Sequence, residues 1–224
     1  MKRLFSIRIA VAALMVLGMG TLITAQMKPS PAAPSAKWLF RYDESLPDPT
    51  HHSDVRTDPR FRPLLEQNFH QQAFYWNKRD PLWKGAYTFL QVGSGKVKVK
   101  ENRYVIISGC VPHMCPEEVG FLWVDTDSKN SEVIFAALTA IPGEGKHGVP
   151  SLFHLWIFCN HSLPQDFVEK SLPDEFLYSM QDWIGEIGGR HVVSAMFVGP
   201  ENKMTPLLPS ALHSTGTSGQ PHEE

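Results

Sequence analysis

The chain is poor in cysteine and lacks the spaced motifs of the common catalytic families. Three cysteines occur among 224 residues. There is no Gly-x-Ser-x-Gly elbow, no His-Glu-x-x-His zinc motif, and no carboxylate pair that spacing alone would place together. The glycine-containing segments 93–96 and 143–146 lack the spacing of a phosphate-binding loop, so we interpret them as turns. We therefore expect a binding protein rather than an enzyme.

An excess of basic charge is also missing. Three of the 21 Lys and Arg lie in residues 1–25, which leaves 18 basic side chains in residues 26–224 against 23 acidic ones. Nucleic-acid binding selects basic surfaces, so a nucleic-acid partner is not expected. A cationic protein is a better match in charge, although mild acidity is common in soluble proteins.

Long apolar runs are confined to the N-terminus. Lys2, Arg3 and Arg8 precede the apolar stretch 9–25, and Thr24 and Ala25 offer a cleavage point before Gln26. This layout is typical of a secretory signal peptide over residues 1–25, with an uncleaved signal anchor as the open alternative. We expect a periplasmic protein, or one secreted further, with no membrane attachment after cleavage.

The remaining chain divides by composition into three parts. Residues 26–58 begin with a Pro-rich tether and continue without a clear period. Residues 59–200 are long enough for a single domain with its own core. Residues 201–224 turn to Pro, Ser, Thr, Gly and His and are expected to form a polar, disordered tail.

Hydrophobic periodicity indicates an α+β fold for residues 59–200. Phe61, Leu65 and Phe69 fall four apart, as on one helix face, and Pro81 and Gly85 are expected to end this helical region. From residue 87 the period changes toward two. Strand-like runs follow at 97–99, 104–108, 121–124, 133–138, 153–158 and 191–198. We expect a mostly antiparallel sheet of about five strands flanked by helices.

A second helix is predicted near residues 171–187. Ser171 is a plausible N-cap, Pro173 suits the first turn, and the apolar stripe includes Phe176, Met180 and Trp183. The run 153–158 is apolar on both parities, which is typical of a central strand covered on both faces.

Two cysteines lie close together between two strand-like runs. In an exported chain, Cys110 and Cys115 are the natural disulfide pair, while Cys159 lies in an apolar run and is expected to be buried. Pro112 stiffens the ring, and His113 lies near its tip. Such a loop could present His113 as a binding anchor or could merely brace a hairpin, and spacing alone leaves both open.

Residues 83–88 (WKGAYT) and 104–115 (YVIISGCVPHMC) resemble the core of the inhibitor-of-vertebrate-lysozyme (Ivy) family. Its members carry a similar Lys-Gly-x-Tyr-Thr segment, then a strand, then a Cys-Lys-Pro-His-Asp-Cys loop. The strand pair at 121–124 and 133–136 follows in the same order, and the resemblance extends over roughly residues 60–200.

The resemblance implies an inhibitor whose loop enters the active-site cleft of c-type lysozyme. The loop histidine would then bond the two catalytic carboxyl groups, which an imidazole can do through its two ring nitrogens. The implied inhibitory loop consists of Cys110, Val111, Pro112, His113, Met114 and Cys115.

Two loop positions depart from the family pattern. The family's Lys is Val111 here, and its Asp is Met114. Each change removes a polar contact worth about 1–3 kcal/mol in a desolvated interface. Either the target therefore differs from vertebrate lysozyme, or inhibition is weak, or the loop has another role. The resemblance also implies an alternative target, the bacterium's own lytic transglycosylases, whose cleft has a single catalytic carboxylate.

The alternatives have less support. Thiol–disulfide catalysis usually requires Cys-x-x-Cys at a helix N-terminus, whereas the spacer here has four residues. The histidines show no ligand spacing, so we expect no metal and no cofactor. A periplasmic structural or interaction protein without inhibitory activity remains a second hypothesis, and pairing into a homodimer stays open.

Overall fold

The structure is a computed structural model. It describes residues 35–47, 54–70, 73–74, 77–93, 97–127, 132–141, 145–146, 149–150, 152–164, 168–187 and 191–212. The chain divides into residues 1–32, which lie outside the described residues, and residues 33–224, which form one compact unit. The expected signal segment 1–25 thus falls outside the description. No helix in the described ranges is long and apolar enough to cross a membrane.

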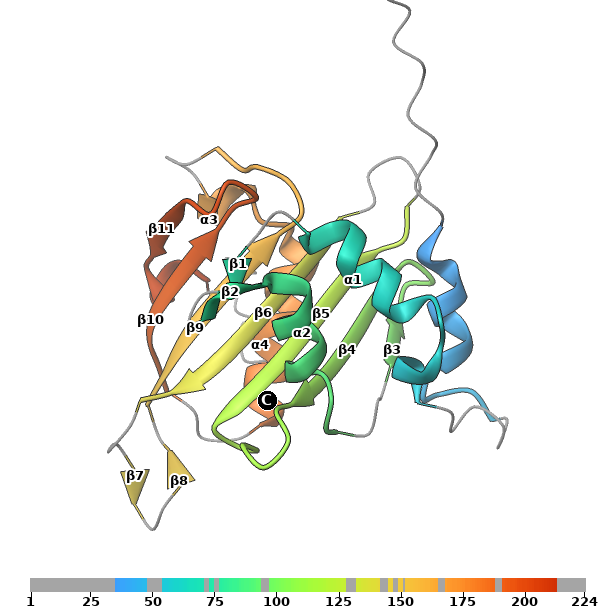
Figure 1. Ribbon diagram of the computed structural model, residues 1–224, viewed down its shortest axis with the longest axis horizontal. Coiled ribbons are helices and arrows are strands. Elements are labelled where there is room, and N and C mark those ends of the chain that lie inside the picture. Colours follow the sequence, from blue (N-terminus) through green and yellow to red (C-terminus); the bar gives the residue numbers. More distant parts are fainter. Residues whose placement is uncertain are drawn as a thin grey trace, which may run out of the picture. The chain divides into compact units, whose positions relative to one another are not determined.

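One large sheet organizes the described part of the unit. Its seven strands run in the order β11-β10-β9-β6-β5-β4-β3 (Figure 1). The strands are β3 (Val97–Lys100), β4 (Tyr104–Cys110), β5 (Glu118–Asp125), β6 (Val133–Ala140), β9 (Leu152–Cys159), β10 (His191–Val198) and β11 (Met204–Leu207). All neighbours are antiparallel except β9 and β10, which are parallel. The α+β class is confirmed, but the expected number of about five strands is wrong.

The additional edge strand shows why the count differed. Strand β11 lies in the segment expected to be a polar tail, and it pairs with β10 from Ala195↔Leu207 to Val198↔Met204. It contains Pro206, which an edge strand tolerates because one of its sides needs no ladder donor. A short 3-10 helix, η5 (Pro209–Leu212), follows it. Two further ribbons, β1 (Ala73–Phe74) with β2 (Asn77–Pro81) and β7 (Gly145–Lys146) with β8 (Val149–Pro150), lie apart from the sheet.

Helices cover both faces of the sheet. On one face, α1 (Phe61–Phe69), α2 (Leu82–Phe89) and the 3-10 helix η1 (Ala36–Tyr42) enclose a core that contains Phe135. On the other face, α4 (Asp174–Glu186) packs Phe176 and Trp183 against Phe121. Figure 1 shows α1 and α2 on the near face and α4 behind the strands. The short helices η3 (Val55–Thr57) and α3 (Val168–Ser171) complete the set.

The central strands are apolar on both parities because both faces are covered. In β9, Phe153, Leu155 and Ile157 belong to the core under α4. The alternate residues Trp156 and Phe158 belong to the core under α1 and α2. Successive side chains of a strand point to opposite faces, which explains this division. The prediction of a doubly covered central strand is confirmed.

Both predicted helices exist, but their ends differ from the prediction. The first ends at Phe69 rather than at Pro81, and Gly85, which was expected to end it, lies inside α2. Helix α1 begins at Phe61, before Pro63, and buries Phe61, Leu65 and Phe69 as expected. Helix α4 has Pro173 as its N-cap residue, whereas Ser171 is the last residue of α3, so the predicted cap is wrong. The acidic residues at its start remain favourably placed near the positive end of the helix dipole.

Part of the segment 26–58, expected to be irregular, is tied to the core. In η1, Leu39 and Tyr42 are buried, and the Tyr42 hydroxyl donates a hydrogen bond to the Asp58 carboxylate at 2.8 Å. Arg60 holds the same carboxylate through its Nε and Nη2 atoms at 2.9 and 2.7 Å. A charge-assisted network therefore joins η1 to the start of α1.

Candidate functional site

The first of the two clustered cysteines ends a strand, and the second lies in the loop that follows. Strand β4 ends at Cys110, β5 begins at Glu118, and Cys110 pairs with Val119 across the two antiparallel strands. The disulfide Cys110–Cys115 is present, with a Cα–Cα distance of 5.5 Å. The predicted pairing is confirmed, and it closes a ring at the tip of this hairpin.

Backbone hydrogen bonds fix the loop in addition to the disulfide. The Val111 amide donates to the Glu118 carbonyl at 3.0 Å, and the Met114 amide donates to the Val111 carbonyl at 3.0 Å. The Glu118 amide donates to the Met114 carbonyl at 2.9 Å. The base of the loop is also joined to β6, because the Ala140 amide donates to the Glu117 carbonyl at 2.8 Å. A loop held in this way has little conformational entropy left to lose on binding.

His113 lies at the tip of this ring and is exposed. Its φ is +65°, in the left-handed region that histidine adopts more readily than β-branched residues do. A non-glycine residue in this conformation costs roughly 1–3 kcal/mol, which the surrounding closure must supply. The fold therefore holds an imidazole at a solvent-exposed position in a defined backbone geometry.

The two departures from the family pattern have different surroundings. Val111 is half-buried and packs against the core that α1 and α2 cover. Met114 is 37% exposed and lies next to His113 in the ring. Of the two replacements, Met114 therefore changes the exposed surface of the loop, whereas Val111 mainly packs the base of the loop against the core.

Helix α2 supports the base of the loop, where an extended chain was expected from residue 87. A Cβ added to Gly109 would lie 2.8 Å from the Leu90 Cα, and one added to Gly120 would lie 2.7 Å from the Phe89 Cβ. Val92 and Cys110 then exchange two backbone hydrogen bonds, at 2.9 and 2.6 Å. The prediction for this segment is wrong because tertiary packing outweighs the weak helix propensity of its Gly, Tyr and Thr residues.

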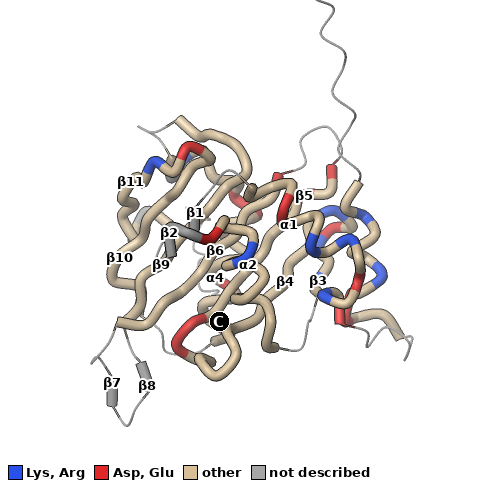
Figure 2. Tube along the Cα trace, in the orientation of Figure 1, with Lys and Arg blue, Asp and Glu red and all other residues tan. Residues whose placement is uncertain are grey.

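Acidic charge lies at the foot of the loop. Glu117 ends the connection between β4 and β5 and Glu118 begins β5, so Figure 2 shows acidic colour there, whereas Lys and Arg gather beside α1 and β3. Burial raises the pKa of the Glu118 carboxyl, and the neighbouring charge of Glu117 raises it further. A cationic group on a partner would favour the ionised form of these carboxyl groups by pairing with them.

All tryptophans of the described residues lie in the two cores or pack against them. Trp123, Trp156 and Trp183 are buried in the two cores. Trp83 is partly buried, and the Arg62 guanidinium lies 4.7 Å from its ring centroid. Trp76 lies outside the described residues.

Sequence reasoning missed one group of side chains. Glu132, Cys159 and His161 lie together, with their ligand-type atoms all within 4.8 Å of one another. The burial of Cys159 is confirmed at 0% exposure. The available signal was the Cys159-x-His161 spacing, but Glu132 is distant in sequence and joins them only through the pairing of β6 with β9.

The comparisons with known proteins bear on the part of the chain that forms α2, β3, β4, the loop, β5 and β6. Residues 83–144 match the family model described as inhibitor of vertebrate lysozyme (Ivy). Neither the search of curated proteins nor that of solved structures returned a match. The matched residues contain both segments on which the resemblance rested, together with the disulfide loop. Residues 83–144 are thus similar to the Ivy family.

Proposed function

We propose that this protein is an exported inhibitor of a peptidoglycan-cleaving glycosidase, and that its disulfide loop enters the enzyme's cleft with His113 foremost. The observation that carries the proposal is the exposed imidazole at the tip of a ring held by a disulfide and by backbone hydrogen bonds. The match of residues 83–144 to the Ivy model supports a lysozyme-inhibitor-like function. Export is supported by the disulfide, which persists in oxidising compartments.

The chemistry of the target explains why a histidine suits this position. Glycoside hydrolysis uses two carboxyl groups, one of which is kept protonated. A neutral imidazole has one donor and one acceptor nitrogen, so it can accept from the protonated carboxyl group and donate to the ionised one. The disulfide loop would thus block the cleft, and its imidazole would occupy both catalytic groups without offering a glycosidic bond to cleave.

The rigid loop adds affinity through preorganisation. A flexible segment loses roughly 0.5–1.5 kcal/mol for each side chain ordered on binding. The closed ring and its packing against α2 and β6 order the loop before binding, so much of this entropy loss is avoided. The half-buried Val111 packs the base of the loop against the core, so its apolar character is compatible with a binding role for the loop.

The proposal is tested with the purified chain, its disulfide intact, in a cell-wall clearing assay against a c-type lysozyme and a lytic transglycosylase. We expect stoichiometric inhibition of one of them. His113→Ala should weaken inhibition by about 2–4 kcal/mol, or roughly 30- to 1,000-fold, as for a central anchor residue. His70→Ala removes another exposed histidine, at the end of α1, and should change nothing.

The result that would overturn the proposal is equally specific. If His113→Ala inhibits as well as the wild type, the imidazole is not the anchor. If neither enzyme is inhibited at micromolar concentration, the loop serves as a structural brace, and the chain is better described as an interaction protein of the envelope.

Met114 provides a second test, because it is the exposed departure from the family pattern. Met114→Asp restores the family's acidic residue and should strengthen inhibition of c-type lysozyme by roughly tenfold, as a regained charged hydrogen bond would. If the natural target is a transglycosylase, the same change should weaken inhibition of that enzyme. Equal affinity of the two forms for both enzymes would show that this position does not select the target.

A further inference from the structure

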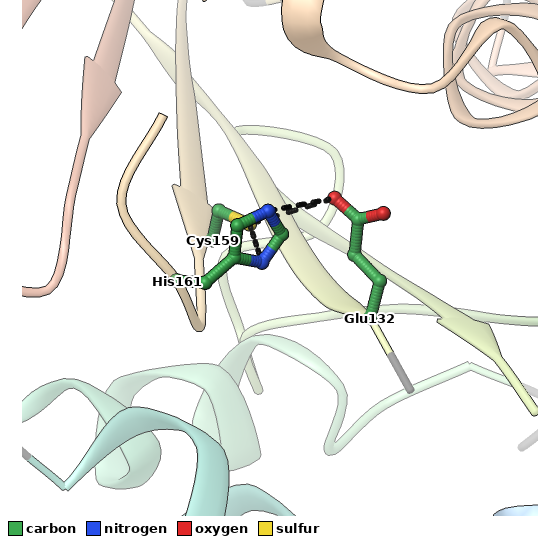
Figure 3. A group of neighbouring side chains, drawn as sticks. All are labelled: Glu132, Cys159 and His161. Atoms are coloured by element: carbon green, nitrogen blue, oxygen red, sulfur yellow. Dashed lines mark hydrogen bonds and ion pairs between the residues drawn. The ribbon is translucent and has the colours of Figure 1, made fainter. Parts of the chain in front are cut away.

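A second group of reactive side chains lies at the end of the sheet opposite the loop. Strand β9 ends at Cys159, the chain bends through Asn160 and His161, and Glu132 directly precedes β6. Cys159 pairs with Ile134 across the two strands, and the Asn160 amide donates to the Val133 carbonyl at 3.2 Å. The strand register therefore brings Glu132 beside Cys159 and His161, as Figure 3 shows.

The three side chains form a triangle. The Cys159 Sγ atom lies 3.7 Å from Glu132 Oε1, and it lies 3.2 Å from Nδ1 and 3.8 Å from Nε2 of His161. The third side, from His161 Nε2 to Glu132 Oε1, measures 3.5 Å. A tetrahedral zinc has bonds of about 2.3 Å to sulfur and about 2.0–2.1 Å to nitrogen and oxygen, which places its ligand atoms roughly 3.3–3.6 Å apart. The observed distances are therefore close to those of three ligands around a common ion.

The arrangement differs from that of a catalytic triad. In a nucleophile–base–acid relay the carboxylate orients the imidazole from the side away from the nucleophile. Here Glu132 Oε1 lies near both the sulfur and the imidazole. The thiol is also fully buried, so it offers no surface to a substrate. Burial raises the pKa of Cys159 to about 12, which is the opposite of nucleophile activation.

We propose that Glu132, Cys159 and His161 bind a Zn²⁺ ion, with the fourth position open to water. The thiolate, imidazole and carboxylate donors suit zinc and exclude the oxygen-preferring Mg²⁺ and Ca²⁺. The three side chains are graded in exposure: Cys159 is buried, the Glu132 side chain is 17% exposed, and the His161 side chain is 47% exposed. The ion thus binds beneath the surface, and its open position lies on the side of His161.

Asn160 orients the histidine for this role. If Nε2 binds the ion, Nδ1 must carry a proton. Two acceptors lie 3.2 Å from Nδ1, the Asn160 Oδ1 atom and the Cys159 sulfur, and Asn160 Oδ1 is the one that remains when the sulfur binds the ion. The Asn160 side chain is itself held, because its amide nitrogen donates to Asn68 Oδ1 at 2.7 Å. Metal-binding histidines usually have such a partner on the other ring nitrogen.

Binding of an ion here releases the Cys159 thiol proton, because the thiolate is the form that binds metal. The ion would crosslink the start of β6 to the bend after β9, because Glu132 and His161 lie on different segments.

The test is a titration of the full, untagged chain with Zn²⁺ by calorimetry and with Co²⁺ by absorption spectroscopy. The Cys110–Cys115 disulfide is kept intact, so that Cys159 is the one thiol present. We expect one ion per chain, a thiolate-to-cobalt charge-transfer band, and a higher melting temperature with Zn²⁺. Cys159→Ser should abolish the band.

His161→Ala is the decisive variant, because an exposed side chain can be removed without damage to the core. It should weaken Zn²⁺ binding by at least roughly tenfold. His191→Ala removes an exposed histidine from the start of β10, at the other end of β9, and should bind as the wild type does. Absence of the charge-transfer band, or equal affinity of His161→Ala and His191→Ala, would overturn the proposal.

Discussion

The two cysteine-containing regions of the sheet use the same residue types in opposite ways. The loop end (residues 109–118) holds its sulfurs in a disulfide and leaves His113 exposed. The thiol end (Glu132 with residues 159–161) buries Cys159 and places His161 beside it. Both ends are joined to β6, one at Ala140 and the other at Ile134. Exposure and crosslinking, rather than composition, therefore distinguish the surroundings of the two histidines.

The two ends also differ in what supports them. The loop end depends on close backbone contact with α2, since Gly109 and Gly120 leave no room for a Cβ against Leu90 and Phe89. The thiol end depends on strand register and on the Asn68–Asn160 hydrogen bond. Changes at one end should therefore leave the other intact, because the two lie at opposite ends of β6 and depend on different contacts.

The largest expected effect concerns the glycine under the loop. Gly109→Ala should lower the free energy of unfolding by about 3 kcal/mol, at the upper end of overpacking costs, because the obstructing Leu90 atoms are backbone. Chemical denaturation measures this loss. The variant should also inhibit less well, since the displaced strand carries the loop, whereas Zn²⁺ affinity should be unchanged.

Gly185→Ala on α4 is the matched control for that substitution. A Cβ at Gly185 meets nothing within 4 Å, so alanine should raise stability by about 0.5–1 kcal/mol through its better helix propensity. Equal effects of the two substitutions would contradict the close packing of α2 against β4.

The loop end was more predictable from the sequence than the thiol end. Cys110, Pro112, His113 and Cys115 are close in the chain, so local spacing alone indicated a small ring. Glu132 and Cys159 meet only through the register of β6 with β9, which periodicity does not specify. Ligand geometry between distant segments is a tertiary property, and for that reason the thiol end escaped prediction.

The elements followed the same rule. Short continuous apolar runs identified the central strands, alternation identified β3, and an apolar stripe identified α4, because burial imposes the pattern of each element. Helix α2 escaped prediction, since its Gly85 and Ala86 are buried by tertiary packing and their local signals favour a turn. Strand β11 escaped it as well, since an edge strand of four residues that contains Pro206 is too short to show a period.

The second largest expected effect is the loss of stability on removal of the disulfide, which distinguishes the paired cysteines from Cys159. The double variant Cys110→Ser/Cys115→Ser should lose about 2 kcal/mol of stability, because a short ring constrains the unfolded chain modestly. A reductant should lower the wild type's stability by the same amount and leave the double variant unchanged. Cys159→Ser should respond to the reductant as the wild type does, since Cys159 is not part of the disulfide. A changed response in Cys159→Ser would show that the two ends are coupled through their sulfurs.

The smallest effect is a pH dependence at the foot of the loop. The pKa of Glu118 is raised above its usual value of 4.5 in the folded chain, first by burial and then by Glu117. Over the interval from 4.5 to the folded pKa, the folded chain binds more protons than the unfolded one, so stability falls as pH rises. Glu118→Gln removes this cost, and its stability relative to the wild type should therefore grow through that interval and then level off. Denaturant unfolding at a series of pH values measures the difference. In a Glu117→Gln background the gain should shrink only slightly, because burial is the larger cause; a gain that vanished there would mean that charge repulsion, not burial, governs the foot of the loop.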